Sequence, residues 1–165
     1  MPINTALLAE LKHESVNTRK ILERVPSDKL DWTPHEKSMK IGELASHIAG
    51  LTVWVERIMK ADEFNFGTAN FNITAPATSE DMLNKFDEKL ANAIKVLELS
   101  DDEKFNEMWT VKYGEQVLYQ LPKKVALRNF TFNHTYHHRG QLSVYLRLLN
   151  ISVPGMYGPS GDEKM

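Results

Sequence analysis

The sequence contains no cysteine, and this absence removes several kinds of chemistry at once. Without thiols the chain cannot form a disulfide scaffold, a thiolate zinc site or a cysteine nucleophile. Any metal ion that the protein holds must therefore be bound by imidazole nitrogens or by oxygen atoms.

The sequence also lacks an excess of positive charge. Its 20 Lys and Arg residues are balanced by 22 Asp and Glu residues, and the formal net charge is -2 at pH 7. A surface that neutralises many phosphates needs the opposite sign of charge. We therefore expect no nucleic-acid partner.

Long apolar runs are absent as well. No stretch approaches the roughly 20 apolar residues that a membrane-spanning helix requires. The amino-terminal segment MPINTALLAELKHES becomes charged too early to act as a secretory signal. We expect a cytoplasmic protein without a membrane partner.

What the chain does have is the composition of an ordinary globular protein. Its 165 residues are 42% hydrophobic and 25% charged. A chain of this length buries roughly two-thirds of the surface that its unfolded form exposes, so it can build a sizeable core. No repeat or shift in composition divides it, which predicts one domain over residues 1–165.

Apolar residues recur at helical spacing in four stretches, over residues 5–25, 39–61, 78–97 and 122–150. Pro26 ends the first stretch, Ser38 and Thr78 can cap the second and third, and Pro122 suits the first turn of the fourth. The pattern predicts an all-α fold, a four-helix bundle, in which the second helix is uninterrupted.

Two connections interrupt the helical periodicity. Residues 26–37 predict a loop that packs Trp32, and residues 62–77 are long enough to form a crossover between helices. Between residues 108 and 119, apolar and polar residues alternate around Gly114, which predicts a short hairpin.

Gly140 lies inside the last predicted helix. Glycine there costs about 1 kcal/mol relative to alanine. We expect a neighbouring helix or a ligand to approach the backbone closely at this position.

The histidines supply the candidate chemistry. His134 and His138 are four residues apart on the last predicted helix, so their imidazoles can reach one metal ion, and His47 on the second helix is a candidate third ligand. If these imidazoles are buried, they need a bound ligand or hydrogen bonds to compensate for the loss of contact with water. Each histidine alone is more commonly a hydrogen-bonded structural residue than a ligand.

Phe130, His134, Gln141, Tyr145, Leu148 and Leu149 share an arc of the last helix that we expect to face the interior.

Other polar residues are weaker candidates, each with a structural alternative. Gln141 could orient water or substrate or be a buried residue bonded to neighbouring helices, and Glu43 could orient His47 or be an exposed carboxylate. Arg139 could recognise an anionic group or pair with a carboxylate across the bundle. Three tyrosines could act as acids but favour packing roles; they are Tyr136, Tyr145 and Tyr157. His137 has a supporting role at most, and we expect His13 and His35 to be exposed.

Three separated segments resemble one family. The segment LRNFTFNHTYHHRGQLSVYLRLLN, with the run HTYHHRGQL, resembles the carboxy-terminal signature of the DinB/YfiT-like superfamily. The stretch LDWTPHEKSMKIGELASHIAG resembles its second-helix region, and the tail VPGMYGPS resembles its usual ending.

The resemblance implies a bundle with long crossovers, commonly a homodimer, and a metal held by three histidines that fall on His47, His134 and His138. It implies a divalent ion such as zinc or nickel, with a low-molecular-weight thiol as a cosubstrate in relatives that use bacillithiol or mycothiol. The expected function is that of a metal-dependent thiol S-transferase or hydrolase acting on a small molecule. The alternative is a non-catalytic metal-binding or stress-related dimeric bundle. No residue is assigned as catalytic.

Overall fold

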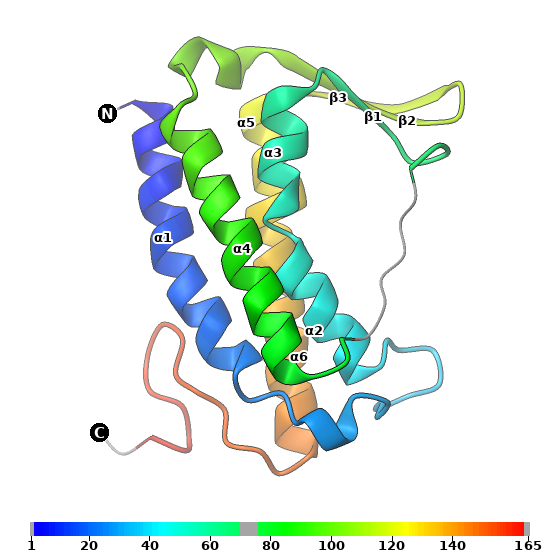
Figure 1. The fold of residues 1–165 in the computed structure, drawn as a ribbon, viewed down its shortest axis with the longest axis vertical. Coiled ribbons are helices and arrows are strands. Elements are labelled where there is room, and N and C mark those ends of the chain that lie inside the picture. The colour runs from blue at the N-terminus through cyan, green and yellow to red at the C-terminus, as the bar shows by residue number, and fades with distance from the viewer. Residues whose placement is uncertain (1, 70–75, 164–165) are drawn as a thin grey trace.

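The computed structural model of the protein describes residues 2–69 and 76–163 as a set of long helices with a small sheet at one end (Figure 1). The α-helices are α1 (Ile3–Leu22), α2 (Ile41–Gly50), α3 (Val53–Lys60), α4 (Ser79–Glu98), α5 (Lys123–Leu127) and α6 (Asn133–Leu148). A π-helical turn, η3 (Arg128–Phe132), joins α5 to α6, and short 3-10 turns occur at η1 (Ser27–Lys29) and η2 (Asp102–Asn106).

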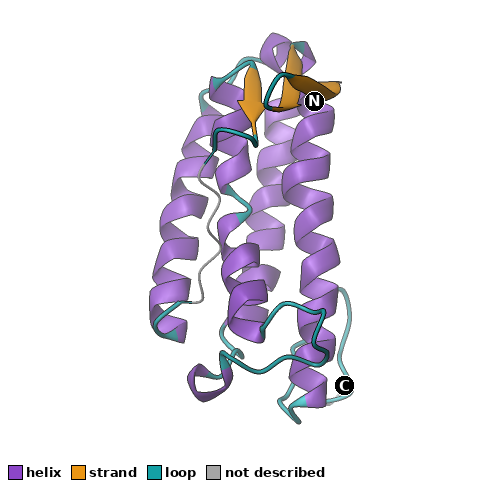
Figure 2. Ribbon diagram, turned by 90° about the vertical axis from the view of Figure 1, so that its right-hand side faces the viewer, coloured by secondary structure: helices purple, strands orange, loops and turns teal. Residues whose placement is uncertain are grey.

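The long helical segments lie side by side. Figures 1 and 2 show α1, α4, the α2–α3 pair and the α5–α6 segment running along the long axis of the molecule. Within the described part of the chain, no helix has both the length and the apolar character needed to span a bilayer.

The prediction of an all-α four-helix bundle is wrong, because the described residues include a three-stranded mixed sheet. Its strands are β1 (Glu63–Asn65), β2 (Met108–Tyr113) and β3 (Gln116–Pro122). β1 pairs in parallel with β2, and β2 pairs antiparallel with β3 around Gly114, whose φ is 59°. The hairpin therefore lies where the alternation predicted it.

β1 comes from the segment that the sequence predicted to be only a crossover. Three residues are too few to show a period-2 pattern, and the partner strand is far away along the chain. Residues 70–75, which belong to the same predicted connection, lie outside the described residues.

Buried apolar side chains form two clusters along the helices. The first joins the sheet to α3 and α5 and contains Trp54, Phe105 and Trp109. The second packs α2 against α4 and α6 through Ile48, Phe86 and other residues, with Trp32 at its margin. The second cluster therefore fixes the position of α2 relative to α6.

The buried face of α6 is rotated from the predicted arc. Leu142 and Leu146 are fully buried, whereas Leu148 is 57% exposed and Gln141 is also exposed. The buried face is centred about one residue further along the helix than the predicted arc, which included His134 and Gln141. The polar histidine pair therefore lies at the margin of the core.

The second predicted helix is not continuous. It begins at Ile41 and breaks at residues 51–52, where the N–H groups of Leu51, Trp54 and Val55 each bond to a carbonyl three residues earlier. Gly50 and Thr52, at this break, have weak helix propensity. The continuous stripe of apolar residues nevertheless predicted one uninterrupted helix. Ser38 does not cap this helix, because its N-cap is Lys40.

Two helix ends confirm simple local rules. The Thr78 hydroxyl accepts a hydrogen bond from the Asp81 N–H at 3.0 Å, as the N-cap of α4. Asn150 adopts a left-handed conformation with φ of 58°, and the Ile151 N–H then bonds to the Leu146 carbonyl at 2.9 Å. This arrangement satisfies the last carbonyls of α6.

A buried polar network fixes α6 to α1. Arg139 is 3% exposed, and its Nη2 donates to Glu14 Oε2 at 2.6 Å. Its Nη1 donates to the Glu14 carbonyl at 3.2 Å and to Thr18 Oγ1 at 3.3 Å. From the carboxy-terminal segment, the Tyr157 hydroxyl bonds to the same carboxylate and accepts from Arg139. Arg139 therefore pairs with a carboxylate across the helices, which was one of its two predicted roles.

Replacing Arg139 with methionine should strongly destabilise the fold. The Glu14 carboxylate would stay buried with only the Tyr157 hydroxyl as a side-chain partner. Breaking a buried pair by removing one partner costs about 3–5 kcal/mol of unfolding free energy, measurable by urea titration.

Arg147→Met is the matched control. Arg147 lies on the same helix and pairs with Asp162 through two bonds of 2.9 and 2.6 Å, but its side chain is 52% exposed. This variant should change stability far less. Equal losses in the two variants would contradict the importance of burial.

Candidate metal centre

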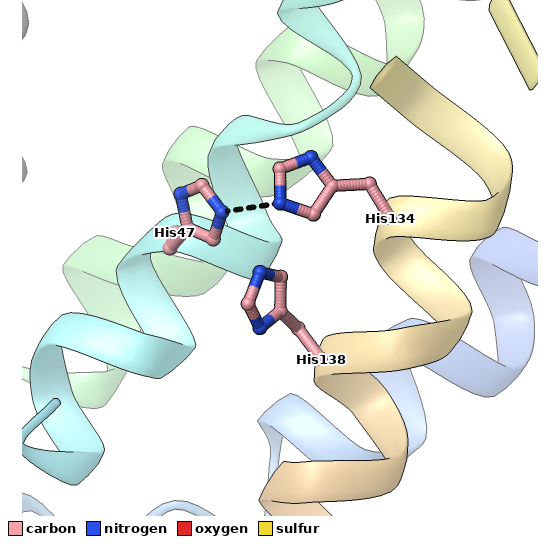
Figure 3. Close-up of side chains that lie close together, drawn as sticks. All are labelled: His47, His134 and His138. Atoms are coloured by element: carbon pink, nitrogen blue, oxygen red, sulfur yellow. Dashed lines mark hydrogen bonds between the residues drawn. The ribbon is translucent and has the colours of Figure 1, made fainter. Parts of the chain in front are cut away.

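Two helices bring three histidines together. His47 lies on α2, and His134 and His138 lie one turn apart on α6. The core between these helices, which includes Ile48 and Leu142, sets the distance across which the rings meet. Figure 3 shows the three imidazoles directed into one common space between the helices.

The ring nitrogens are close enough to share one ion. Nε2 of His47 and Nε2 of His134 are 3.1 Å apart. Each residue of the triad offers one ring nitrogen such that all three atoms lie within 4.8 Å of one another. Nitrogen ligands of a tetrahedral zinc ion lie roughly 3.3 Å apart, given Zn–N bonds of about 2.0–2.1 Å. Among residues 2–69 and 76–163, no other set of three or more His, Asp or Glu side chains is grouped closely enough to hold a metal ion.

Hydrogen bonding fixes which nitrogen of His138 faces that space. The side-chain oxygen of Gln141 lies 2.7 Å from His138 Nδ1. An amide oxygen only accepts, so Nδ1 carries the proton and Nε2 has the free lone pair. Figure 3 shows the Nε2 side of this ring turned toward the other two imidazoles.

His134 has a comparable partner in the backbone. Its ring forms a hydrogen bond with the carbonyl of Phe130, which belongs to the π-helical turn. Because Nε2 faces His47, Nδ1 is the nitrogen left for this bond. Partners of this kind orient metal-binding histidines and increase the basicity of the nitrogen that faces the metal.

Burial keeps the imidazoles neutral. Burial first, and then the rings of His138 and His134, lower the pKa of His47 from 6.5 to about 4. Burial is also the largest cause of the lowered pKa values of His134 and His138, although the bonds to Phe130 and Gln141 act in the opposite direction. At neutral pH the three rings therefore present lone pairs rather than charges.

The donor set fits a divalent ion. Three neutral imidazoles suit zinc, nickel, cobalt, copper or iron. His138 is buried, whereas His47 and His134 are only partly buried, so the group is not sealed from the surface. Three protein ligands at an accessible site leave coordination positions for water or substrate.

The other predicted site residues lie elsewhere or act differently. Glu43 does not orient His47: its carboxylate accepts the Lys40 N–H at 3.0 Å at the start of α2. Gln141 is exposed rather than buried, and it orients His138. No neighbouring helix approaches Gly140 closely, because nothing beyond its own helix backbone and its chain neighbours lies within 4 Å of where its Cβ would be.

The remaining histidines and tyrosines are not in the group. His13 and His35 are exposed, as predicted, and His137 is an exposed neighbour whose ring packs on that of His138 at 4.9 Å. Tyr145 packs edge-on against Trp32 at 5.7 Å. Burial and the Glu10 carboxylate raise the pKa of Tyr136, which bonds to Glu10 at 2.7 Å on α1. Tyr136 and Tyr157 therefore serve the contact with α1.

Two features of the site were not predicted, namely the contact of Gln141 with His138 and the contact of the Phe130 carbonyl with His134. The spacing of three residues between His138 and Gln141 could have indicated a contact on one helix face. The Phe130 carbonyl left no sequence signal, because its availability depends on the π-helical turn.

Comparisons with known proteins agree with this architecture. Two crystal structures of DinB-like proteins each superpose with a TM-score of 0.69. The one from Bacillus cereus ATCC 10987 is 19% identical, and the superposition covers 91% of this chain and 95% of that one. The Bacillus subtilis protein YjoA is 17% identical, with 97% and 99% covered. At these identities the likeness shows the fold alone.

Sequence comparison adds a relative and a family. The chain is 43% identical over 44 residues to the uncharacterised protein YrdA of Bacillus subtilis strain 168. That match covers 27% of this chain and 26% of the length of YrdA. The family model described as "DinB family" matches residues 1–164. The chain therefore belongs to the DinB family.

Proposed function

We propose that this protein binds one divalent metal ion through Nε2 of His47, His134 and His138. We further propose that it is a metal-dependent enzyme that acts on a small molecule. The observation that carries the proposal is the convergence of three neutral imidazoles from two helices, within 4.8 Å. The reaction we propose is thiol S-transfer or hydrolysis.

The chain's own residues have defined tasks in this proposal. Gln141 and the Phe130 carbonyl hold the Nδ1 protons of His138 and His134, so that Nε2 of each ring is the ligand. Among the described residues, no side chain or backbone group forms a hydrogen bond with Nδ1 of His47, so the ring proton can move to that nitrogen when Nε2 becomes a ligand. When bound, a divalent ion lowers the pKa of a coordinated water or thiol and so supplies a nucleophile at neutral pH.

Alanine substitution at each ligand position tests the site. His47→Ala, His134→Ala and His138→Ala should each lower zinc affinity at least tenfold, because each removes one of three ligands. Elemental analysis of tag-free protein, and competition with a chromophoric chelator, measure the loss. His137→Ala is the matched control, since this exposed histidine lies beside His138 but outside the group. Unchanged metal content in all three variants would rule out the site.

Turnover separates an enzyme from a metal-binding protein. Metal-loaded protein should consume electrophiles in a panel containing a small thiol, or hydrolyse esters and amides in a panel without one, and His134→Ala should abolish the reaction. Metal binding without turnover in either panel would overturn the catalytic proposal and favour a non-catalytic metal-binding protein.

Gln141→Ala should weaken metal binding without removing a ligand. Loss of the acceptor at Nδ1 frees the His138 ring to rotate and lowers its basicity, which typically costs about 10–100-fold in affinity. Gln141→Glu keeps an acceptor and should retain the affinity. Ser143→Ala is a suitable control, because the Ser143 hydroxyl bonds only to the Gly140 carbonyl of its own helix. Equal affinity of the alanine variant and the parent would show that the contact has no effect on the ligand.

The metal-free protein should lose stability as the pH falls from about 6.5 to 4. The folded state lowers the pKa of His47 to about 4, so in this interval the unfolded chain binds more protons than the folded one. In the presence of chelator, the NMR titration of the His47 ring should have a midpoint near 4, and His47→Gln should reduce the pH dependence of unfolding. A midpoint at or above 6.5 would contradict the burial argument.

A further inference from the structure

A lysine of α4 lies beside the last turn of α2, close to His47. Nζ of Lys89 lies 3.6 Å from the point where a Cβ of Gly50 would be. His47 and Gly50 are three residues apart in α2, and positions with this spacing are neighbours on one helix face, with Cβ atoms about 5–6 Å apart. Nζ of Lys89 is therefore no more than about 10 Å from the Cβ of His47.

This face of α2 is accessible from outside. Ser46, His47 and Gly50 are partly exposed, whereas Ile48 on the other side of the helix is buried. Gly50 has no side chain that would separate the Lys89 ammonium from a molecule bound at the histidines. A molecule bound there can therefore extend along α2 as far as Lys89.

Lys89 is a partly buried cation without a bonded acceptor. Among the described residues, no carboxylate, hydroxyl or carbonyl oxygen forms a hydrogen bond or an ion pair with its ammonium group. Burial first, and then the positive charges of Lys85 and Arg57, lower the pKa of Lys89, while Glu88 acts in the opposite direction. An anion beside Nζ would accept from its three donors and stabilise its charge.

A structural role at the end of α2 is the alternative. A cation stabilises the carboxyl end of a helix through the helix dipole, and the long stem of a lysine can cover apolar surface. Hydrogen bonds to the last carbonyls of the helix would be the direct sign of such a role, and Lys89 forms none within the described part of the chain. The unused donors and the two neighbouring cations favour an anionic ligand instead.

We propose that Lys89 binds an anionic group, such as a carboxylate, on the small molecule that the protein acts on at its histidine-bound metal. This inference rests on the proposed function, because the metal is where the other end of the same molecule would bind. The substrate or the thiol cosubstrate would then carry a negative charge at a distance from its reacting atom. That charge would lie beside Gly50.

A series of thiols of increasing length tests this role of Lys89. Thiol binding to the cobalt-loaded, full-length protein is measured through the cobalt–thiolate absorption band. Mercaptopropionate, mercaptohexanoate and mercaptoundecanoate are each compared with the mercapto-alcohol of equal chain length. At the length that reaches Lys89, the carboxylate should bind at least about fivefold more tightly than the alcohol, because the ammonium pairs with it.

Variants of Lys89 assign the preference to this residue. Lys89→Met should remove the preference for the carboxylate, and Lys89→Arg should keep it. Lys85→Met is the matched control, because it removes the same charge from an exposed position one turn away on α4, and it should retain most of the preference. A lower free energy of unfolding in Lys89→Met with an unchanged preference would instead assign Lys89 to helix stability.

A second measurement separates this inference from the proposed thiol transfer. If no thiol produced the cobalt–thiolate band, thiol transfer would be contradicted, and an NMR titration of the zinc-loaded protein would decide the role of Lys89. Hexanoate should shift the Gly50 amide resonance in the parent but not in Lys89→Met, and hexanol should shift it in neither. Equal binding of carboxylates and alcohols at every chain length, or an unshifted Gly50 resonance with hexanoate, would overturn the inference.

Discussion

The close approach of three neutral imidazoles is the constraint on which the rest of the site depends. Nε2 of His47 and Nε2 of His134 are 3.1 Å apart, and the two lone pairs would repel unless a proton or a cation lay between them. In the metal-free protein a proton on Nε2 of one of these two rings serves, as the donor of a hydrogen bond to the other. A metal ion at the same point would satisfy all three rings at once. Under the proposed function, a cation bound at this point would replace the internal hydrogen bond between His47 and His134.

Helix α6 can hold this arrangement because it is anchored on its other side. His138 and Arg139 are adjacent, yet one side chain faces α2 and the other pairs with Glu14 of α1. The apolar residues Leu142 and Leu146 continue the buried face beyond them. The ion pair with Glu14 and the apolar contacts restrict rotation of α6, and rotation would separate the imidazoles. A polar residue far from the proposed chemistry thus helps to define the ligand geometry.

The sequence was sufficient where local chemistry decides the structure. Spacing of four residues placed His134 and His138 on one face, the Thr78 cap and the end of α6 near residue 150 obey short-range rules, and the alternation around Gly114 located the hairpin. The third histidine depended on family resemblance as well as on its place at the edge of an apolar stripe. Long-range pairing was beyond a periodicity argument, so β1 was missed and the fold was predicted to be all-α. The exposed Gln141 was misjudged because its burial was inferred from an arc centred one residue away from the true core.

The sequence also did not predict the two departures from regular α-helix, at residues 51–52 and in η3. Both lie next to the histidines. Residues 51–52 tighten the backbone one turn after His47, and η3 widens it immediately before α6 begins and His134 follows. A wider turn changes which carbonyls are engaged within the helix, and here the Phe130 carbonyl meets the His134 ring. The tightened segment also leaves the buried Thr52 hydroxyl without a hydrogen-bond partner among the described residues, as η3 does for the Thr131 hydroxyl. π-helical turns commonly occur at functional sites because they cost stability and persist where they orient something. In this protein, η3 orients a proposed ligand on one face and leaves a buried hydroxyl on the other.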